Sequence, residues 1–216
     1  MTEPAVTLTD YALAVESAVF VIALSRLNSR DKELCLWFVV FFASIGAASI
    51  LEGTVHGFFL PALSQGRRIL WPATILAILI TSLAAWNIGA VLHLSERRAV
   101  LVRRLAIAQL VIFSLFVLFV SSKFYVGIIA YLPSTLFLLF TFITAYRRRA
   151  DAGVRWGVAG LALTLVAAAV QPSCRNSSDL LRSQRALPRH SGRRTRDDLR
   201  RRQIDLPCLA AIPEES

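Results

Sequence analysis

The stretch ELCLWFVVFFASIGAASILEGTVHGFFL, residues 33–60, decides the fold. It is apolar and long enough to cross a bilayer with some tilt, because about 20 apolar residues span the hydrocarbon core. Small residues between Ala43 and Ser49 suit close contact with a neighbouring helix. Glu52 and His56 interrupt the apolar character four residues apart, so they lie on one face of a helix. The stretch predicts a transmembrane helix that carries a polar pair on one face.

The composition of the whole chain indicates the same environment. Of its 216 residues 56% are hydrophobic, and the mean hydropathy of +0.58 is typical of a membrane protein rather than a soluble domain. The net charge of +10 does not indicate a nucleic-acid partner, because the basic residues before position 171 lie in short loops between apolar runs. Cys35, Cys174 and Cys208 form no CxxC motif, so neither a disulfide framework nor a zinc knuckle is expected. Membrane lipid is the predicted surrounding, and no nucleic acid is expected to bind.

Five further apolar runs predict transmembrane helices over residues of about 10–27, 69–94, 100–120, 124–146 and 153–171. The residues before the first run contain no Lys or Arg, so this run is expected to be a retained helix rather than a cleaved signal peptide. Pro133 is the one proline expected inside a helix, where it should kink the fifth span and free a carbonyl. The predicted fold class is an all-α polytopic membrane helix bundle of six transmembrane helices, residues 1–171, followed by a disordered basic tail, residues 172–216.

The basic residues predict the orientation of the bundle, because short cytoplasmic loops hold the excess of Lys and Arg. Alternate loops on one side contain eleven of them, against three on the other side: Arg67, Arg68 and Lys123. We therefore expect the N-terminus outside and the protein in the cell (inner) membrane. This orientation places several polar or aromatic residues in the outer half of the membrane, as candidates for one pocket: Glu16, Glu52, His56, Trp71 and Tyr131.

Two interpretations of Glu52 and His56 remain open. Ionisable groups inside a span are costly and usually face a bundle interior or a cavity, which favours a polar pocket. In that pocket His56 would be a metal ligand, and Glu52 would be a second ligand or would orient the imidazole ring. A catalytic zinc site typically takes three protein ligands, and the printed sequence supplies no third. In the alternative, the pair only hydrogen-bonds to each other or to neighbouring Ser and Thr residues and stabilises helix packing.

The C-terminal segment also has two interpretations. Residues 172–203 contain ten Arg, no Lys and no aromatic residue, which is typical of a solvated tail. However, the sixth helix should end outside, where basic residues are otherwise few, and a GC-rich gene read out of frame can yield such a composition. In the neighbouring frame the codons of residues 175–194 can spell GIHPIYFDHNALYHAIQAVA, a seventh helix with three His near its start. The alternative hypothesis is a frameshift near residues 170–174, which the nucleotide sequence would decide.

Several motifs together resemble a group of uncharacterised bacterial seven-helix membrane proteins over residues 8–171: TDYALA at 9–14, EGTVHGF at 52–58, LW at 70–71 and the histidine motif of the neighbouring frame. More distantly, the layout is similar to the membrane hydrolase superfamily that includes the alkaline ceramidases. In those, a second-helix His and two seventh-helix His bind zinc, with a Ser one turn before the first His and an Asp in the third helix. His56 matches the first His, whereas Glu52 replaces the Ser, the third span has no Asp, and the His pair is missing from the translated chain.

For an intact relative, the resemblance implies zinc-dependent hydrolysis of an amide or ester of a lipid near the outer leaflet, with Glu52 taking a proton from the attacking water. For the printed chain we expect neither bound zinc nor activity. A non-enzymatic membrane sensor or structural module is the alternative. A transporter is the third class, because no internal repeat or pair of broken helices is visible in the sequence.

Overall fold

The computed structural model describes residues 3–27, 31–59, 64–149, 155, 157–163 and 165. Five helices make up most of this part: α1 (Pro4–Arg26), α2 (Lys32–Phe58), α3 (Gln65–His93), α4 (Glu96–Phe119) and α5 (Phe124–Arg149). All five are long and apolar enough to cross a membrane. The described residues of the predicted sixth span are also helical. The prediction of an all-helical membrane protein is confirmed, while the number of spans and the orientation of the N-terminus stay predictions.

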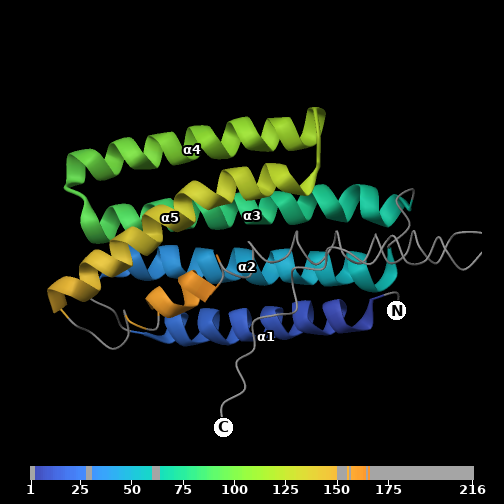
Figure 1. The fold of residues 1–216 in the computed structure, drawn as a ribbon, viewed down its shortest axis with the longest axis horizontal. Helices are drawn as coiled ribbons and strands as arrows, with labels where there is room; N and C mark the ends of the chain where they lie inside the picture. The colour runs from blue at the N-terminus through green and yellow to red at the C-terminus, as the bar shows by residue number, and fades with distance from the viewer. Residues whose placement is uncertain are drawn as a thin grey trace, which may run out of the picture. The chain divides into compact units, whose positions relative to one another are not determined.

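Successive helices are antiparallel, because the connections between them are short (Figure 1). α1 packs on α2, α2 packs on α3, and α3 contacts both α4 and α5. α3 is the most buried of the five, whereas α1 and α4 keep most of their surface exposed. α3 is therefore the centre of the bundle, and the outward faces of α1 and α4 are surfaces that lipid can cover.

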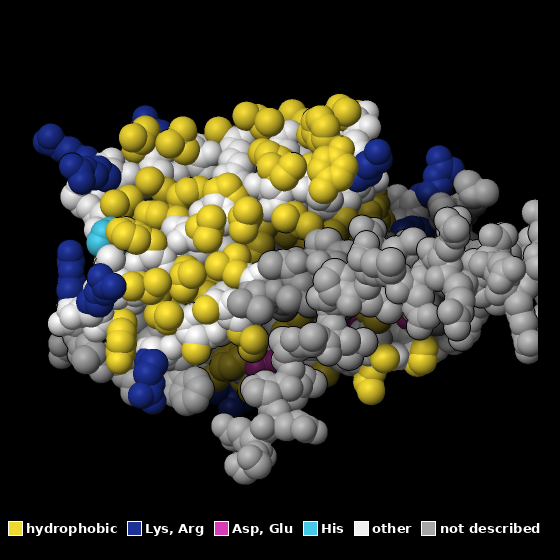
Figure 2. All heavy atoms as spheres, viewed as in Figure 1, with side chains coloured by type: hydrophobic (Ala, Val, Ile, Leu, Met, Phe, Trp, Pro, Cys, Tyr) yellow, Lys and Arg dark blue, Asp and Glu magenta, His cyan; other side chains and the backbone are white. Residues whose placement is uncertain are grey.

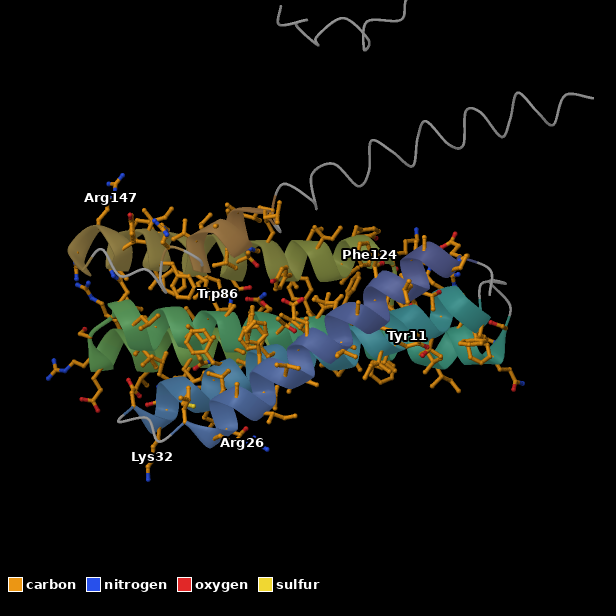
Figure 3. The ribbon with its side chains drawn as sticks, turned by 90° about the horizontal axis from the view of Figure 1, so that it is seen from below. Tyr11, Arg26, Lys32, Trp86, Phe124 and Arg147 are labelled. Carbon is orange, nitrogen blue, oxygen red and sulfur yellow. The ribbon has the colours of Figure 1, made fainter. Side chains whose placement is uncertain are left out.

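Most of the basic residues lie at one end of the bundle and fewer lie at the other, as Figure 2 shows in dark blue. Arg26, Lys32 and Arg147 all lie toward this end in Figure 3, and Phe124 lies toward the other. We call the first the Arg-rich end and the second the Arg-poor end. The distribution of charge that the sequence predicted is thus present in the fold, because α1, α3 and α5 all finish at the Arg-rich end.

Two helix starts differ from the sequence expectation. α1 begins at Pro4 rather than near residue 10. Proline is favoured in a first helical turn because a backbone N–H at that position would have no intrahelical partner, so its absence costs nothing. α3 begins at Gln65, where the Ser64 hydroxyl accepts a hydrogen bond from the Arg67 N–H at 3.4 Å. Pro72 therefore lies inside α3, and the prediction that Pro133 is the one proline in a helix interior was wrong. Apolar character marks where a span meets lipid, but a capping residue sets where the helix begins.

A buried polar cluster joins α3, α4 and α5 around the turn that precedes Pro133. The proline lacks an N–H and its ring pushes the preceding turn away, which weakens backbone pairing there. The Ala130 carbonyl in that turn accepts hydrogen bonds from the Gln109 amide at 2.6 Å and from the Ser82 hydroxyl at 3.1 Å. The Trp86 indole N–H donates to the Gln109 side-chain oxygen at 3.0 Å. Each of these polar groups has a partner, so the cluster stabilises the kinked helix against its two neighbours.

The chain divides into residues 1–167, which hold all five helices, and a second unit of residues 168–216. The predicted domain boundary at residue 171, the disordered tail and the shifted reading frame all fall outside the described residues.

Candidate functional site

The candidate site lies where α1 and α2 pack closely at the Arg-poor end. One face of α1 is lined by residues three or four positions apart, which share that face on a helix: Thr7, Asp10, Ala14 and Ser17. Glycines of α2 lie against this face. A Cβ built on Gly53 would lie 3.0 Å from the Asp10 Cβ, and one on Gly57 would lie 3.1 Å from the Thr7 Cγ2. The helices approach this closely because α2 has no side chains at these contacts, as in other membrane helix pairs.

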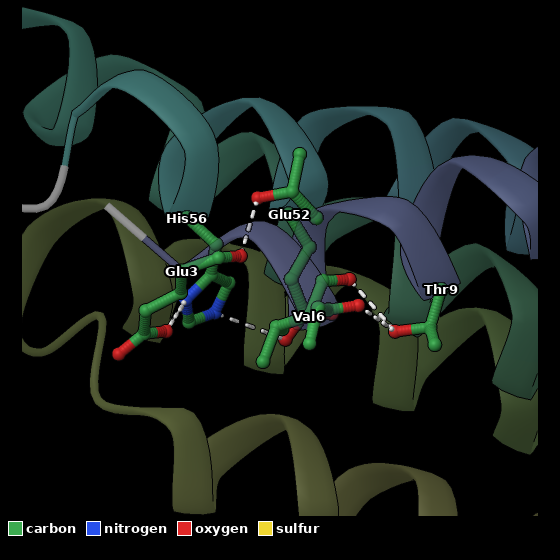
Figure 4. Close-up of polar contacts among 7 residues, drawn as sticks. Glu3, Val6, Thr9, Glu52 and His56 are labelled. Atoms are coloured by element: carbon green, nitrogen blue, oxygen red, sulfur yellow. Dashed lines mark hydrogen bonds and ion pairs between the residues drawn. The ribbon is translucent and has the colours of Figure 1, made fainter. Parts of the chain in front are cut away.

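This packing brings Glu3, just before α1, to His56 on α2. The Glu3 carboxylate accepts a hydrogen bond from His56 Nδ1, with Oε2 at 2.8 Å (Figure 4). The Glu52 Oε1 atom lies 3.9 Å from His56 Nε2, on the other side of the ring. A neutral imidazole that donates from Nδ1 keeps its lone pair on Nε2. His56 therefore offers that lone pair on the side of the ring that faces Glu52.

Asp10 and Tyr11 bring further polar groups to the same end. The Tyr11 hydroxyl lies 3.1 Å from the Thr54 hydroxyl, which itself donates to the Ile50 carbonyl, so Tyr11 is the donor between the two. Asp10 interacts electrostatically with His56 and Glu52. Its Oδ2 atom is buried and, within the part of the chain that the structure describes, makes no hydrogen bond. The site thus combines three carboxylates, one imidazole and one phenol at the ends of two helices.

The site is partly open to its surroundings. About a quarter of the His56 and Glu52 side chains is exposed, and Glu3 is exposed to a larger extent. Parts of these side chains are therefore accessible from outside the helix pair.

Of the five residues predicted to share a pocket, the structure brings Glu52 and His56 together, as their spacing predicted. Glu16 is exposed on another face of α1. Trp71 donates from its indole N–H to the Ser122 carbonyl at 2.7 Å, at the junction of α3 with the α4–α5 connection. Tyr131 is half-buried on α5, which packs on α3 and α4. Among the described residues, no hydrogen bond or ion pair joins these three to the pair on α2.

Glu3, Asp10 and Tyr11 were missed as site residues in the sequence. Asp10 was placed at the boundary of the first span and Glu3 outside it, because the start of the helix was expected six residues later than Pro4. A signal for them does exist. The polar and small residues at positions 7, 10, 14 and 17 have helical spacing, and so do Gly46, Gly53 and Gly57 in the second span.

The described donors do not make a complete metal site. Within the described ranges, no group of three or more His, Cys, Asp or Glu side chains is arranged to hold a metal ion. Glu52 and His56 would be two ligands of a site that usually takes three. Glu3 fits the role of the carboxylate that holds the other ring nitrogen of a metal-binding histidine.

Comparison with known proteins gives a family and no activity. A family model described as a family of unknown function, DUF6962, matches residues 5–182, which include all five helices except Pro4 and run past residue 171. No curated protein and no solved structure matches the chain. The chain is therefore a member of the DUF6962 family, with a fold of apolar helices that are suited to a membrane.

Proposed function

We propose that Glu3, Glu52 and His56 are one half of a zinc site of a membrane hydrolase, and that the printed chain lacks the other half and is inactive. The observation that carries this proposal is the arrangement of the His56 ring. Its Nδ1 is held by Glu3 at 2.8 Å, and its Nε2 is 3.9 Å from the Glu52 carboxylate. The carboxylate–histidine pair is the usual outer-shell arrangement of histidines that bind a metal through the other nitrogen.

The distance between Nε2 and the Glu52 carboxylate supports a shared ligand. At 3.9 Å it is too long for a direct hydrogen bond, which rarely exceeds about 3.2 Å between nitrogen and oxygen. A small side-chain movement would let both groups bind one ion, because two ligands of a tetrahedral zinc, each bound at about 2.0–2.2 Å, lie about 3.3–3.6 Å apart. The pair is also partly exposed, so its side chains are accessible to an ion or a water molecule.

The missing ligands are proposed to come from the neighbouring reading frame of the C-terminal codons. The helix that this frame can encode has three His near its start and would enter from the same side as the outer ends of α1 and α2. Entry of this helix from the outer side also requires the N-terminus to be outside, and the excess of Lys and Arg at the Arg-rich end supports that orientation. A site at this depth suits a substrate with its polar bond near the lipid headgroups, such as an amide or ester of a lipid.

The residues of the chain have separate roles in the proposed reaction. Glu3 keeps the proton on His56 Nδ1 and so fixes the ring with Nε2 toward Glu52. Zinc, when bound, supplies a water molecule that ionises near neutral pH. Glu52 either binds the metal beside His56 or takes the proton of the attacking water. Glu52→Gln separates these roles, because loss of a ligand lowers zinc content whereas loss of a base lowers activity alone.

The test compares the printed chain with a chain in which the neighbouring frame is restored after residue 171. Both are purified in the same detergent, and zinc per chain is measured by elemental analysis. Stoichiometric zinc is expected in the restored chain, background zinc in the printed chain, and loss of zinc in restored His56→Ala. His93→Ala is the matched control, because His93 lies at the Arg-rich end and contacts Thr144 at 3.4 Å. Equal zinc in the restored chain and its His56→Ala variant would refute the assignment.

A non-enzymatic sensor or structural module is the second candidate, and one observation favours it. The Glu3–His56 and Tyr11–Thr54 hydrogen bonds already join α1 to α2 without a metal. In that case His56→Ala lowers the melting temperature of the printed and restored chains equally, and neither chain contains zinc.

A further inference from the structure

An apolar groove between α4 and α5 lies at the Arg-poor end, apart from the acid–histidine site. It has a volume of about 230 Å³ and is lined by Ile112, Phe113, Phe116, Tyr125, Val126 and Ile129. The first three are on the second half of α4, and the others are on the first two turns of α5. Hydrophobic side chains cover this edge of the bundle in Figure 2. In a membrane this groove faces hydrocarbon, so its occupant must be apolar along most of its length.

Basic side chains lie around the same end. The Arg67 guanidinium lies over the Trp71 ring, 5.4 Å from its centroid, and the Trp71 and Phe124 ring centroids are 5.9 Å apart. The Trp71 indole donates to the Ser122 carbonyl at 2.7 Å, next to the exposed Lys123. The first two turns of α3 and the start of α5 are therefore held together, with basic side chains on α3 and just before α5.

On α3, α4 and α5 the charge at this end has one sign, because the carboxylates of the acid–histidine site belong to α1, to α2 or to the residue before α1. Arg68, beside Arg67, is exposed as well. Between Glu52 and Glu96, and again between Glu96 and Asp151, the sequence contains no acidic residue. The basic residues near the groove therefore attract anions, and Trp and Tyr rings at this level are typical of the membrane–water interface.

We propose that this end of α3, α4 and α5 binds an anionic phospholipid. Arg67, Arg68 and Lys123 hold the phosphate of the headgroup, and one acyl chain lies in the α4–α5 groove. A phospholipid fits better than a free anion, because the cationic patch and the apolar groove meet within one turn of α5, between Lys123 and Val126. The inference is independent of the proposed hydrolase activity, since it uses neither His56 nor Glu52.

The headgroup is tested on the full chain in detergent by native mass spectrometry, with phosphatidylglycerol and phosphatidylcholine of identical acyl chains. We expect phosphatidylglycerol to bind about tenfold more tightly, because each basic residue near an anionic headgroup contributes to the attraction. The triple variant Arg67→Gln, Arg68→Gln, Lys123→Gln should lose this preference. Lys123→Gln alone should lower the preference for phosphatidylglycerol, and this single variant replaces the triple variant if the latter does not fold. Equal binding of both lipids to the unmodified chain would overturn the proposal.

Matched controls separate this site from general charge attraction and from other ligands. Arg97→Gln with Arg98→Gln removes charge from exposed residues at the Arg-rich end and should keep the preference. Ile129→Trp fills the groove and should weaken binding of the long-chain lipid, whereas Ile128→Trp, which does not line the groove, should not. Inorganic phosphate or dihexanoyl phosphatidylglycerol binding as well as the long-chain lipid would overturn the role of the groove. Dimer peaks in place of lipid adducts would identify a second copy of the chain as the occupant and would also overturn it.

Discussion

The packing that forms the site predicts opposite effects for two Gly→Ala substitutions. In Gly53→Ala the new Cβ lies 3.0 Å from the Asp10 Cβ, closer than ordinary packing allows, so α1 and α2 must move apart. In Gly127→Ala the new Cβ lies 3.5 Å from the Ile75 Cγ2, which is an ordinary contact. Both substitutions gain about 0.5–1 kcal/mol from helix propensity, and this gain cancels in the comparison. The difference between them is therefore the overpacking cost at Gly53, about 1–3 kcal/mol.

The assay is thermal unfolding of the two variants and the unmodified chain in one detergent. For a chain of this length about 1 kcal/mol corresponds to a shift of about 2–4 °C, so Gly53→Ala should melt about 2–12 °C below Gly127→Ala. Gly127→Ala should melt at or above the unmodified chain. If Gly53→Ala is as stable as Gly127→Ala, then α1 and α2 do not pack through Gly53, and the proximity of Glu3 to His56 loses its basis.

Two further substitutions test the polar contacts inside the bundle. Gln109→Leu removes the acceptor of the Trp86 N–H and one donor to the Ala130 carbonyl, so it should lower the free energy of unfolding by about 1–3 kcal/mol. No loss in a chemical unfolding titration would contradict this hydrogen-bond assignment. Glu33→Gln removes the ion pair with Arg103, in which both side chains are well exposed, and keeps the hydrogen bond from Arg103 Nε to the buried Asn87 Oδ1, so it should cost less than about 1 kcal/mol, and the cost should fall as salt is added. A loss as large as that of Gln109→Leu, and independent of salt, would show that the pair is buried.

Much of the fold could be predicted from the sequence, because lipid imposes a length and an apolar composition on each span. The helices α2 to α5 occur where the apolar runs predicted them, with ends that differ by a few residues. The start of α1 was missed because polar residues such as Thr7 and Asp10 lie within its first turns. They are tolerated there because they face α2 rather than lipid, which hydropathy alone does not report.

The candidate site was harder to predict, because charge counting gives the depth of a residue but not its direction around the helix axis. Glu16 and Asp10 both belong to α1 and differ by six residues, which separates them by about 120° around the axis. Asp10 therefore faces Gly53 of α2, whereas Glu16 is exposed. The pair on α2 was predictable because a spacing of four residues places Glu52 and His56 on one face whatever the neighbours are. Their partner Glu3 depends on how α1 packs, which required the structure.

The most direct test of the proposed site is the protonation of the His56 ring in the printed chain. Two-bond ¹H–¹⁵N correlation spectra of the chain with ¹⁵N-labelled histidine, recorded at mildly alkaline pH, show which nitrogen carries the proton; His56→Ala identifies the signal. The proton is predicted on Nδ1, where it is donated to Glu3, and Glu3→Ala should remove this preference. A proton on Nε2 would mean that the ring cannot offer that nitrogen to a metal beside Glu52, and would contradict the proposed site.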